Sequence, residues 1–160
     1  MNRAPGTVVA VCLSPDSGVP KHAQPEVTVG TYGLEGDYHA GPTRVRRGEV
    51  MPNHRHVSVV AQEVIDEVNR TLGTEIPPGG LGENVLVQGL GDLGDLAPGD
   101  RLLFSSGVEL EVTAQNDPCK NLTVYHPQTV KRLYGRRGIV AVVIKPGSLR
   151  TGDGVELVKA

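Results

Sequence analysis

Cys119 is the residue of this sequence best suited to do chemistry. It lies in NDPCKNL (residues 116–122), a polar stretch in which a proline precedes it and a lysine follows. A structural cysteine behaves as a small hydrophobe among apolar neighbours, as Cys12 does in TVVAVCL. A thiolate is both a nucleophile and a soft metal ligand, and neighbouring cations favour it. We therefore interpret Cys119 as a candidate reactive or ligating thiol. An incidental, half-buried loop cysteine is the alternative, and composition alone slightly favours it.

Two short stretches supply candidate acid–base or metal-binding groups. GLEGDYH (residues 33–39) contains Asp37 and His39, and HRH contains His54 and His56. Both histidines of HRH would share one face of a strand, so a metal site with Asp37 and His39 is conceivable. Their spacing matches no zinc motif, and roles in polar loops and at strand entry are the preferred interpretation.

A glycine-rich turn places Glu83 and Asn84 directly after the glycines of GGLGEN. Glycines let a backbone approach a ligand closely, or they simply permit a turn. The stretch is neither a Walker loop nor a dinucleotide fingerprint, because the terminal Lys-Ser/Thr and the strand–helix context are missing.

Basic residues fall mostly in or beside expected loops. Any one of them is explained by a solvated surface, but several converging near Cys119 would form a phosphate pocket, because guanidinium groups match phosphate oxygens. These residues are Arg44, Arg46, Arg47, Arg55, Lys120, Lys131, Arg132, Arg136 and Arg137.

The elements that must position these groups are mainly strands. The 24 valines, one phenylalanine, 21 glycines and 12 prolines favour short strands joined by tight turns. The convincing helix covers residues 61–72 and stops at Gly73. A short helix is possible within 127–135, and 30–54 lacks periodicity, as functional or disordered segments do. Strands are expected at 7–13, 26–29, 55–60, 85–88, 108–114 and 139–144, and after the Gly-Asp turns of 96–104 and 149–157.

Length and charge limit the possible classes. We expect one mainly β domain over residues 1–160. A net charge of −2 provides no global field for nucleic acid or anionic membranes, and no apolar run approaches the roughly 18 to 20 residues of a membrane span. We find no secretion signal, and two unlike cysteines make no disulfide framework, so a reducing cytoplasm is the expected location.

The motifs and their order along the chain resemble those of the MOSC domain, which is named after the C-terminal domain of molybdenum cofactor sulfurases. The resemblance covers about residues 30–158 and is typical of small single-domain members. It is carried by GLEGDYHAG, RHVSVVAQE, PPGGLGENVLVQGL, LAPGDRLLF, LEVTAQNDPCKNL and RRGIVAVVIKPGSLRTGDGVEL. It implies a closed or nearly closed mixed β-barrel of the pyruvate-kinase barrel type with few helices.

The resemblance also implies roles for the candidate residues. Cys119 would either ligate molybdenum of a pterin cofactor or carry sulfur as a persulfide. Arg55 and one of Arg136 or Arg137 would contact phosphate or pterin. The polar neighbours would bind the pterin edge, fix the cysteine loop, orient the basic loop or relay protons: Asn84, Asn116, Glu83, Asp37 and His39.

Three functions stay open from the sequence. The first is a molybdenum-dependent reductase of N-hydroxylated small molecules, with electrons from a separate protein. The second is a sulfur carrier supplied by a separate sulfur donor, and the third is a nonredox binding module. Pyridoxal phosphate is not expected, because 160 residues leave no room for the cysteine desulfurase of two-domain sulfurases. The iron–sulfur extension of some relatives is also missing, and no nucleic-acid or membrane partner is expected.

Overall fold

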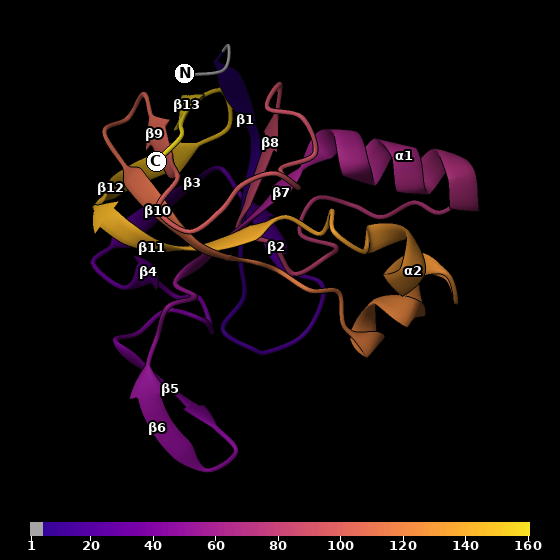
Figure 1. Cartoon of the computed structure of the whole chain (residues 1–160), viewed down its shortest axis with the longest axis horizontal. Coiled ribbons are helices and arrows are strands. Elements are labelled where there is room, and N and C mark those ends of the chain that lie inside the picture. The colour runs from indigo at the N-terminus through magenta and orange to yellow at the C-terminus, as the bar shows by residue number, and fades with distance from the viewer. Residues whose placement is uncertain (1–4) are drawn as a thin grey trace.

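Seven strands close into a barrel in the computed structural model, which describes residues 5–160 (Figure 1). The order is β13-β9-β10-β11-β7-β8-β1, and β1 pairs with β13 to close it. β7 and β8 are parallel, whereas the other pairs are antiparallel. The strands are β1 (Gly6–Leu13), β7 (Val57–Ala61), β8 (Val85–Gln88), β9 (Arg101–Phe104), β10 (Glu109–Gln115), β11 (Ile139–Lys145) and β13 (Gly154–Val158). The expected mainly β, closed mixed barrel is confirmed. The first four residues of the predicted domain lie outside the described part.

Valine-rich strands fill the barrel, because β-branched side chains pack well on a pleated surface. β8 buries three consecutive residues, Val85 to Val87, because one face points into the barrel and the helix α1 (Gln62–Leu72) contacts the strand from outside. A short strand, β2 (His22–Gln24), pairs with the far end of β1. Cys12 lies in β1 and is fully buried, in agreement with its apolar sequence context.

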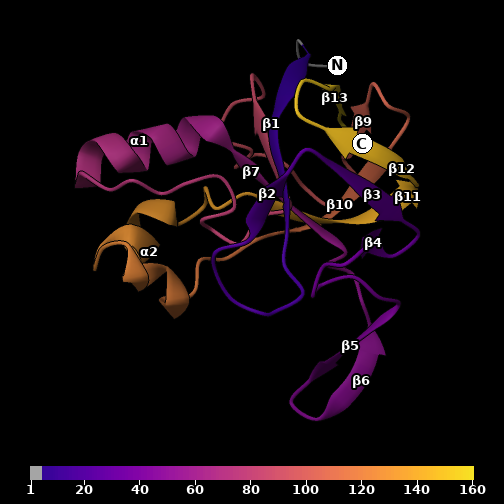
Figure 2. The same cartoon turned by 180° about the vertical axis from the view of Figure 1, so that it is seen from behind.

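A second sheet and a hairpin accompany the barrel. β12 (Gly147–Arg150), β3 (Glu26–Gly30) and β4 (Gly33–Leu34) form the sheet, and β5 (Thr43–Arg46) pairs with β6 (Glu49–Pro52). The hairpin projects away from the barrel in two opposite views (Figures 1 and 2).

The absence of periodicity in 30–54 therefore did not mean an absence of strands. The hairpin of β5 and β6 buries little, and its paired Val45 and Val50 are 67% and 71% exposed. A strand with no face toward a core has no reason to alternate apolar and polar residues, so its pattern could not be recognised.

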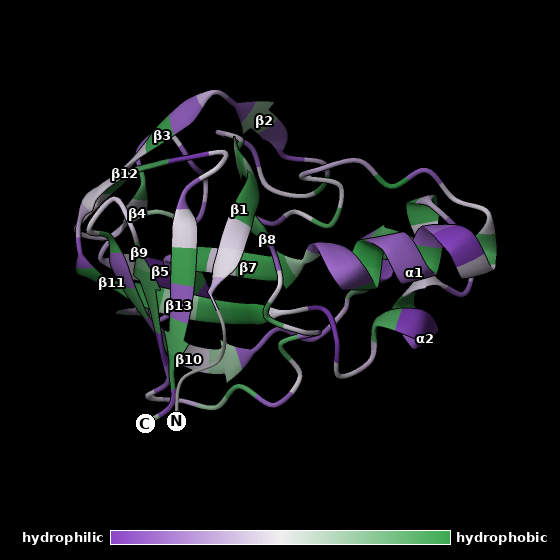
Figure 3. Ribbon diagram, turned by 90° about the horizontal axis from the view of Figure 1, so that it is seen from above, coloured by the Kyte–Doolittle hydropathy of each residue, from purple (hydrophilic) through white to green (hydrophobic). Residues whose placement is uncertain are grey.

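Three short helical segments lie on one side of the barrel. α1 (Gln62–Leu72) buries Val64, Ile65 and Val68 and ends at Gly73, whose left-handed backbone caps it as expected. α2 (Thr129–Leu133) contacts α1 and the 3₁₀ segment η1 (Lys120–Val124) that follows Cys119. Hydrophobic and hydrophilic residues alternate along the ribbon of α1 (Figure 3). None of the described helices is long and apolar enough to cross a membrane.

Most of the predicted elements agree with the structure within a residue or two. The strand expected at 55–60 begins only at Val57, so His54 and His56 precede it. Both Gly-Asp turns lead into barrel strands, β9 and β13. The strands that the sequence did not reveal are β2, β4, β5, β6 and β12.

Gly138 permits the close approach of β11 to β7. Its φ is +99°, in the left-handed region, and a Cβ built on it would overlap the carbonyl oxygen of Val59. Its own carbonyl accepts a hydrogen bond of 2.9 Å from the Asn116 N–H. A glycine here therefore joins the strand pairing to the start of the cysteine loop.

We expect Gly138→Ala to destabilise the fold through both strain and overlap. Gly152 is the matched control, because its φ is +96° but no atom lies within 4 Å of its added Cβ. Urea unfolding should show that Gly138→Ala lowers the free energy of unfolding by roughly 2 to 4 kcal/mol more than Gly152→Ala. Equal losses in the two variants would contradict the proposed overlap with Val59.

Candidate functional site

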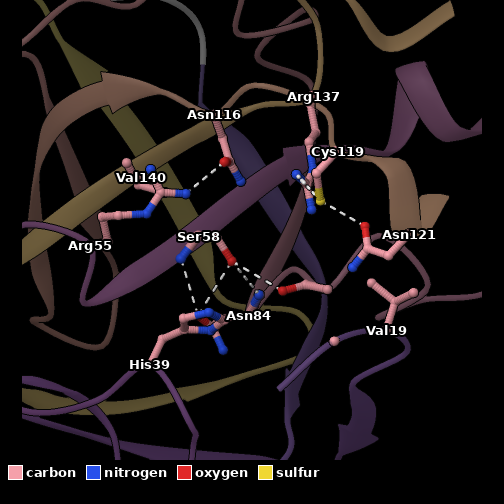
Figure 4. Close-up of a pocket in the computed structure, with 12 residues that line it drawn as sticks. Val19, His39, Arg55, Ser58, Asn84, Asn116, Cys119, Asn121, Arg137 and Val140 are labelled. Carbon is pink, nitrogen blue, oxygen red and sulfur yellow. Dashed lines mark hydrogen bonds between the residues drawn. The ribbon is translucent and has the colours of Figure 1, made fainter. Parts of the chain in front are cut away.

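The Cys119 thiol is exposed in the loop between β10 and η1. Its Sγ donates to Asn121 Oδ1 at 2.7 Å, and Arg137 Nη1 lies 3.6 Å from the same sulfur. Figure 4 shows Cys119 between these two side chains. A solvent-accessible thiol held beside a guanidinium is suited to nucleophilic or metal-binding chemistry.

Arg137 connects the cysteine loop to the glycine-rich loop. Nη1 donates to the Asp117 carbonyl and Nη2 to the Leu81 carbonyl, both at 2.8 Å. Its Nε is the one buried side-chain nitrogen or oxygen within residues 5–160 that lacks a hydrogen-bond partner. Tyr125 adds a second connection, since its hydroxyl donates to the Gly80 carbonyl at 2.6 Å.

A cavity of about 160 Å³ opens beside the thiol. Arg55 and Arg137 are its charged walls, and none of the lining residues, all within the described part of the chain, carries a carboxylate. We call it the cysteine pocket. It is lined by Gly18, Val19, His39, Arg55, Ser58, Gly82, Asn84, Asn116, Cys119, Asn121, Arg137 and Val140. An adjoining cavity of about 320 Å³ shares His39 and Arg55 with it.

Arg55 and Asn116 form one wall of the cysteine pocket. Arg55 Nη2 donates to Asn116 Oδ1 at 2.8 Å, which holds the guanidinium against the start of the cysteine loop. Burial, followed by the charges of Arg44, Arg137 and Arg46, lowers the pKa of Arg55. Positive charge therefore converges here, as a binding site for an anionic group requires.

Glu83 lies beneath the glycine-rich loop and does not line the pocket. Its carboxyl oxygens accept the N–H groups of Gly79 at 2.9 Å and Leu81 at 3.0 Å. Burial raises the pKa of Glu83 to about 7 despite these hydrogen bonds. The side chain thus fixes the shape of the loop from below.

Asn84 does line the pocket, but its amide is already engaged. Oδ1 accepts the Ser58 N–H at 3.0 Å, and Nδ2 donates to the Cys12 carbonyl at 3.2 Å. Asn84 therefore connects β7 to β1 at the floor of the pocket.

Asp37 lies behind His39 rather than on the pocket wall, and a buried lysine joins the two. Lys21 Nζ lies 2.5 Å from Asp37 Oδ1 and 3.0 Å from His39 Nδ1. Burial opposes the charged form of Asp37, but Lys21 and the N–H groups of Ser14 and His39 outweigh it and lower the pKa of Asp37. His39 alone of this group reaches the pocket.

Sequence reasoning missed Lys21, Ser58 and Asn121. A lysine in a proline-rich loop normally indicates a solvated surface, yet the Lys21 side chain is 0% exposed. Ser58 looked like an ordinary strand residue. Asn121 lies two residues after Cys119, and this proximity was a usable signal.

Other sequence candidates lie elsewhere. Arg136 pairs with Glu67 of α1 at 2.6 Å, so of the two adjacent arginines Arg137 is the one at the pocket. His56 Nδ1 accepts the Val143 N–H, and His54 is outside the lining set. No group of three or more histidine, cysteine, aspartate or glutamate side chains within residues 5–160 is arranged to hold a metal ion. The conceivable histidine–aspartate metal site is therefore not assembled.

The closed mixed barrel and its loop cysteine beside arginines define the class of protein. The MOSC domain model matches residues 35–156, and the chain belongs to this family. YuaD of Bacillus subtilis, named as a metal–sulfur cluster biosynthesis protein, is 35% identical in an alignment of 145 positions that covers 78% of this chain and 76% of YuaD.

Solved structures show the same fold. The YuaD crystal structure matches with a TM-score of 0.88 at 28% identity, over 100% of this chain and 98% of that chain. YiiM of Geobacillus stearothermophilus matches with a TM-score of 0.72 at 20% identity, over 96% of this chain and 75% of that one. The MOSC resemblance inferred from the motifs is thereby confirmed.

The two cysteines should react very differently. Burial, aided by Glu83, raises the pKa of Cys12 to about 12, and its side chain is inaccessible, whereas Cys119 is exposed. We expect a disulfide reagent such as DTNB to titrate one thiol in the native protein and two in guanidinium chloride. In Cys119→Ser the native reaction should disappear. A fast second thiol in the native protein would contradict the assigned burial of Cys12.

Arg137 should assist reactions at the Cys119 sulfur. Its guanidinium stabilises negative charge at 3.6 Å and attracts the anionic DTNB, so Arg137→Gln should slow the reaction several-fold at low salt. Arg136→Gln is the matched control, because Arg136 pairs with Glu67 instead. The difference should shrink at high ionic strength. Identical rates for the two variants would remove Arg137 from the site.

Proposed function

We propose that this protein binds a molybdenum pterin cofactor through Cys119 and reduces N-hydroxylated small molecules. The observation that carries the proposal is an exposed thiol on the wall of a pocket whose charged side chains are both arginines. A thiolate is a suitable ligand for a soft metal centre, and guanidinium groups bind phosphate oxygens in pairs.

The residues of the cysteine pocket fit such a group. Cys119 would be the metal ligand, while Arg55 and Arg137 would contact the phosphate or the pterin. The Nε of Arg137 is buried without a hydrogen-bond partner, so one donor of this side chain is not yet used. Asn116 would keep Arg55 in place, as it does through the hydrogen bond of 2.8 Å. The lack of lining carboxylates within the described residues favours a ligand with negative charge.

The bound metal would supply the two-electron redox chemistry. The overall reaction, R–NHOH + 2e⁻ + 2H⁺ → R–NH₂ + H₂O, requires an external electron source, and we propose a separate donor protein. The chain itself binds and orients. Arg55 and Arg137 hold anionic groups, and Glu83 and Asn84 fix the loops.

Asp37 and His39 take unequal parts in this proposal. His39 borders both cavities, where it can contact a ligand, whereas Asp37 acts through Lys21. We therefore assign Asp37 to holding Lys21 and His39 in place, and His39 to contacting the ligand at the pocket wall.

A sulfur carrier is the second candidate. Two observations favour it: the Cys119 sulfur is exposed, as transfer between proteins requires, and the relative YuaD is named for metal–sulfur cluster biosynthesis. The step is sulfur transfer, Cys119–SH + donor–S–SH → Cys119–S–SH + donor–SH. It needs no net electrons, and Arg137 would stabilise the negative charge on the terminal sulfur.

Metal analysis of protein made in cells that synthesise molybdenum cofactor tests the first function. We expect close to one molybdenum per chain in the parent and little in Cys119→Ala, because the thiolate ligand is lost. Cys12→Ala is the matched control, since it removes the thiol outside the pocket and should keep the metal. Parent protein with molybdenum should also reduce a hydroxylaminopurine when a reductant is supplied.

Molybdenum missing from parent and variant alike would refute the cofactor proposal. Intact mass of the same samples then tests the sulfur carrier, which predicts an adduct of about 32 Da on the parent that Cys119→Ala lacks. If neither molybdenum nor the adduct is found, the nonredox binding module remains, and Cys119→Ala should then bind ligand as well as the parent does.

A further inference from the structure

Lys21 and Asp37 form an ion pair with both side chains 0% exposed. The loop that carries Lys21 lies directly against the glycine-rich loop, because the Lys21 N–H donates to the Gly79 carbonyl at 2.8 Å. Gly79 has a φ of +81°, and a Cβ on it would overlap the Lys21 carbonyl oxygen. Burying two charges is costly unless their remaining hydrogen-bonding capacity is used. Besides Asp37, the ring of His39 also forms a hydrogen bond with Lys21.

The hydrogen-bonding roles around Lys21 follow from its chemistry. An ammonium group has three donors and no acceptor. At 3.0 Å from Lys21 Nζ, the Nδ1 of His39 must therefore be the acceptor, so it carries no proton. A neutral imidazole with an unprotonated Nδ1 carries its proton on Nε2.

All but one of the charged groups that face His39 favour the neutral form of its ring. Partial removal of the half-exposed ring from water comes first, and Lys21, Arg55 and Arg44 add positive charge, whereas Asp37 alone favours protonation. Together they lower the pKa of His39 to about 4. His39 therefore stays uncharged at neutral pH.

The ring is placed where its second nitrogen can be used. The His39 side chain is 45% exposed and lines both the cysteine pocket and the adjoining cavity. Its backbone N–H donates to Asp37 Oδ2 at 3.1 Å, and the Tyr38 ring packs edge-on against it at 5.2 Å between centroids. In Figure 4, His39 lies across the pocket from Cys119.

We infer that Lys21 and Asp37 are positioning residues that hold His39 as a neutral Nε2–H donor at the wall of the cysteine pocket. The donor suits an oxygen or ring-nitrogen acceptor on a bound small molecule. Together with Arg55 and Arg137 it gives the pocket donors on several sides, which matches an electron-rich or anionic ligand. The inference holds for either proposed function, because it concerns the protein's own ring.

Nitrogen-15 NMR of the histidine side chains tests this in the intact protein without any ligand. We expect His39 to show the signals of a neutral Nε2–H tautomer that do not change between about pH 5.5 and 8. His22, exposed on β2, is the internal reference for assignment. A protonated Nδ1, a mixture of tautomers or a charged ring in this pH range would overturn the inference.

A double variant tests the role of the ion pair. Lys21→Met with Asp37→Asn removes both charges together, so no unpaired buried charge remains. We expect the His39 ring to titrate closer to the ordinary value of about 6.5 and to lose its single tautomer. An unchanged His39 spectrum in the folded double variant would show that Lys21 does not position the ring. If the variant does not fold, the parent spectrum decides.

Discussion

The central constraint is that β7 is a buried strand whose backbone must be hydrogen-bonded on both edges. Buried N–H and C=O groups rarely remain unpaired, so β7 pairs with β8 on one side and β11 on the other. The loop before β8 carries Glu83 and Asn84, and the turn before β11 carries Arg137. Because β8 runs parallel and β11 antiparallel to β7, the loop before β8 lies toward the N-terminal end of β7, where Asn84 meets Ser58, and the turn before β11 lies toward its C-terminal end. The long Arg137 side chain spans this separation and reaches the Leu81 carbonyl.

The site then joins these loops through side chains rather than through a packed core. Arg137 donates to the Leu81 carbonyl of the glycine-rich loop and to the Asp117 carbonyl of the cysteine loop, and Tyr125 adds a connection from the end of η1. Such contacts leave the Cys119 sulfur open to solvent while its backbone is held. A thiol that must meet a cofactor or another protein needs both properties, since access alone would leave its geometry undefined.

Buried charge is the cost of this arrangement. Glu83, Lys21 and Asp37 are all enclosed, and apolar residues of similar size could give a more stable protein. Their positions explain why they are useful. Glu83 holds the glycine-rich loop through two N–H groups, and the pair of Lys21 and Asp37 holds His39 through Nδ1. Burying these groups lowers the stability of the fold, but it fixes the walls of the pocket before any ligand binds.

The sequence by itself determined the mainly β class, most strand positions, the end of α1 at Gly73 and the contrast between Cys12 and Cys119, whereas the closed barrel was implied by the MOSC resemblance. These depend on local composition and on neighbours along the chain, which periodicity records. Only the tertiary structure decided that Arg137 rather than Arg136 faces the thiol, that Glu83 is buried, and that Lys21 joins Asp37 to His39. Such contacts join residues far apart in the chain, and the burial that gives a charged group its role exists only after the barrel has closed.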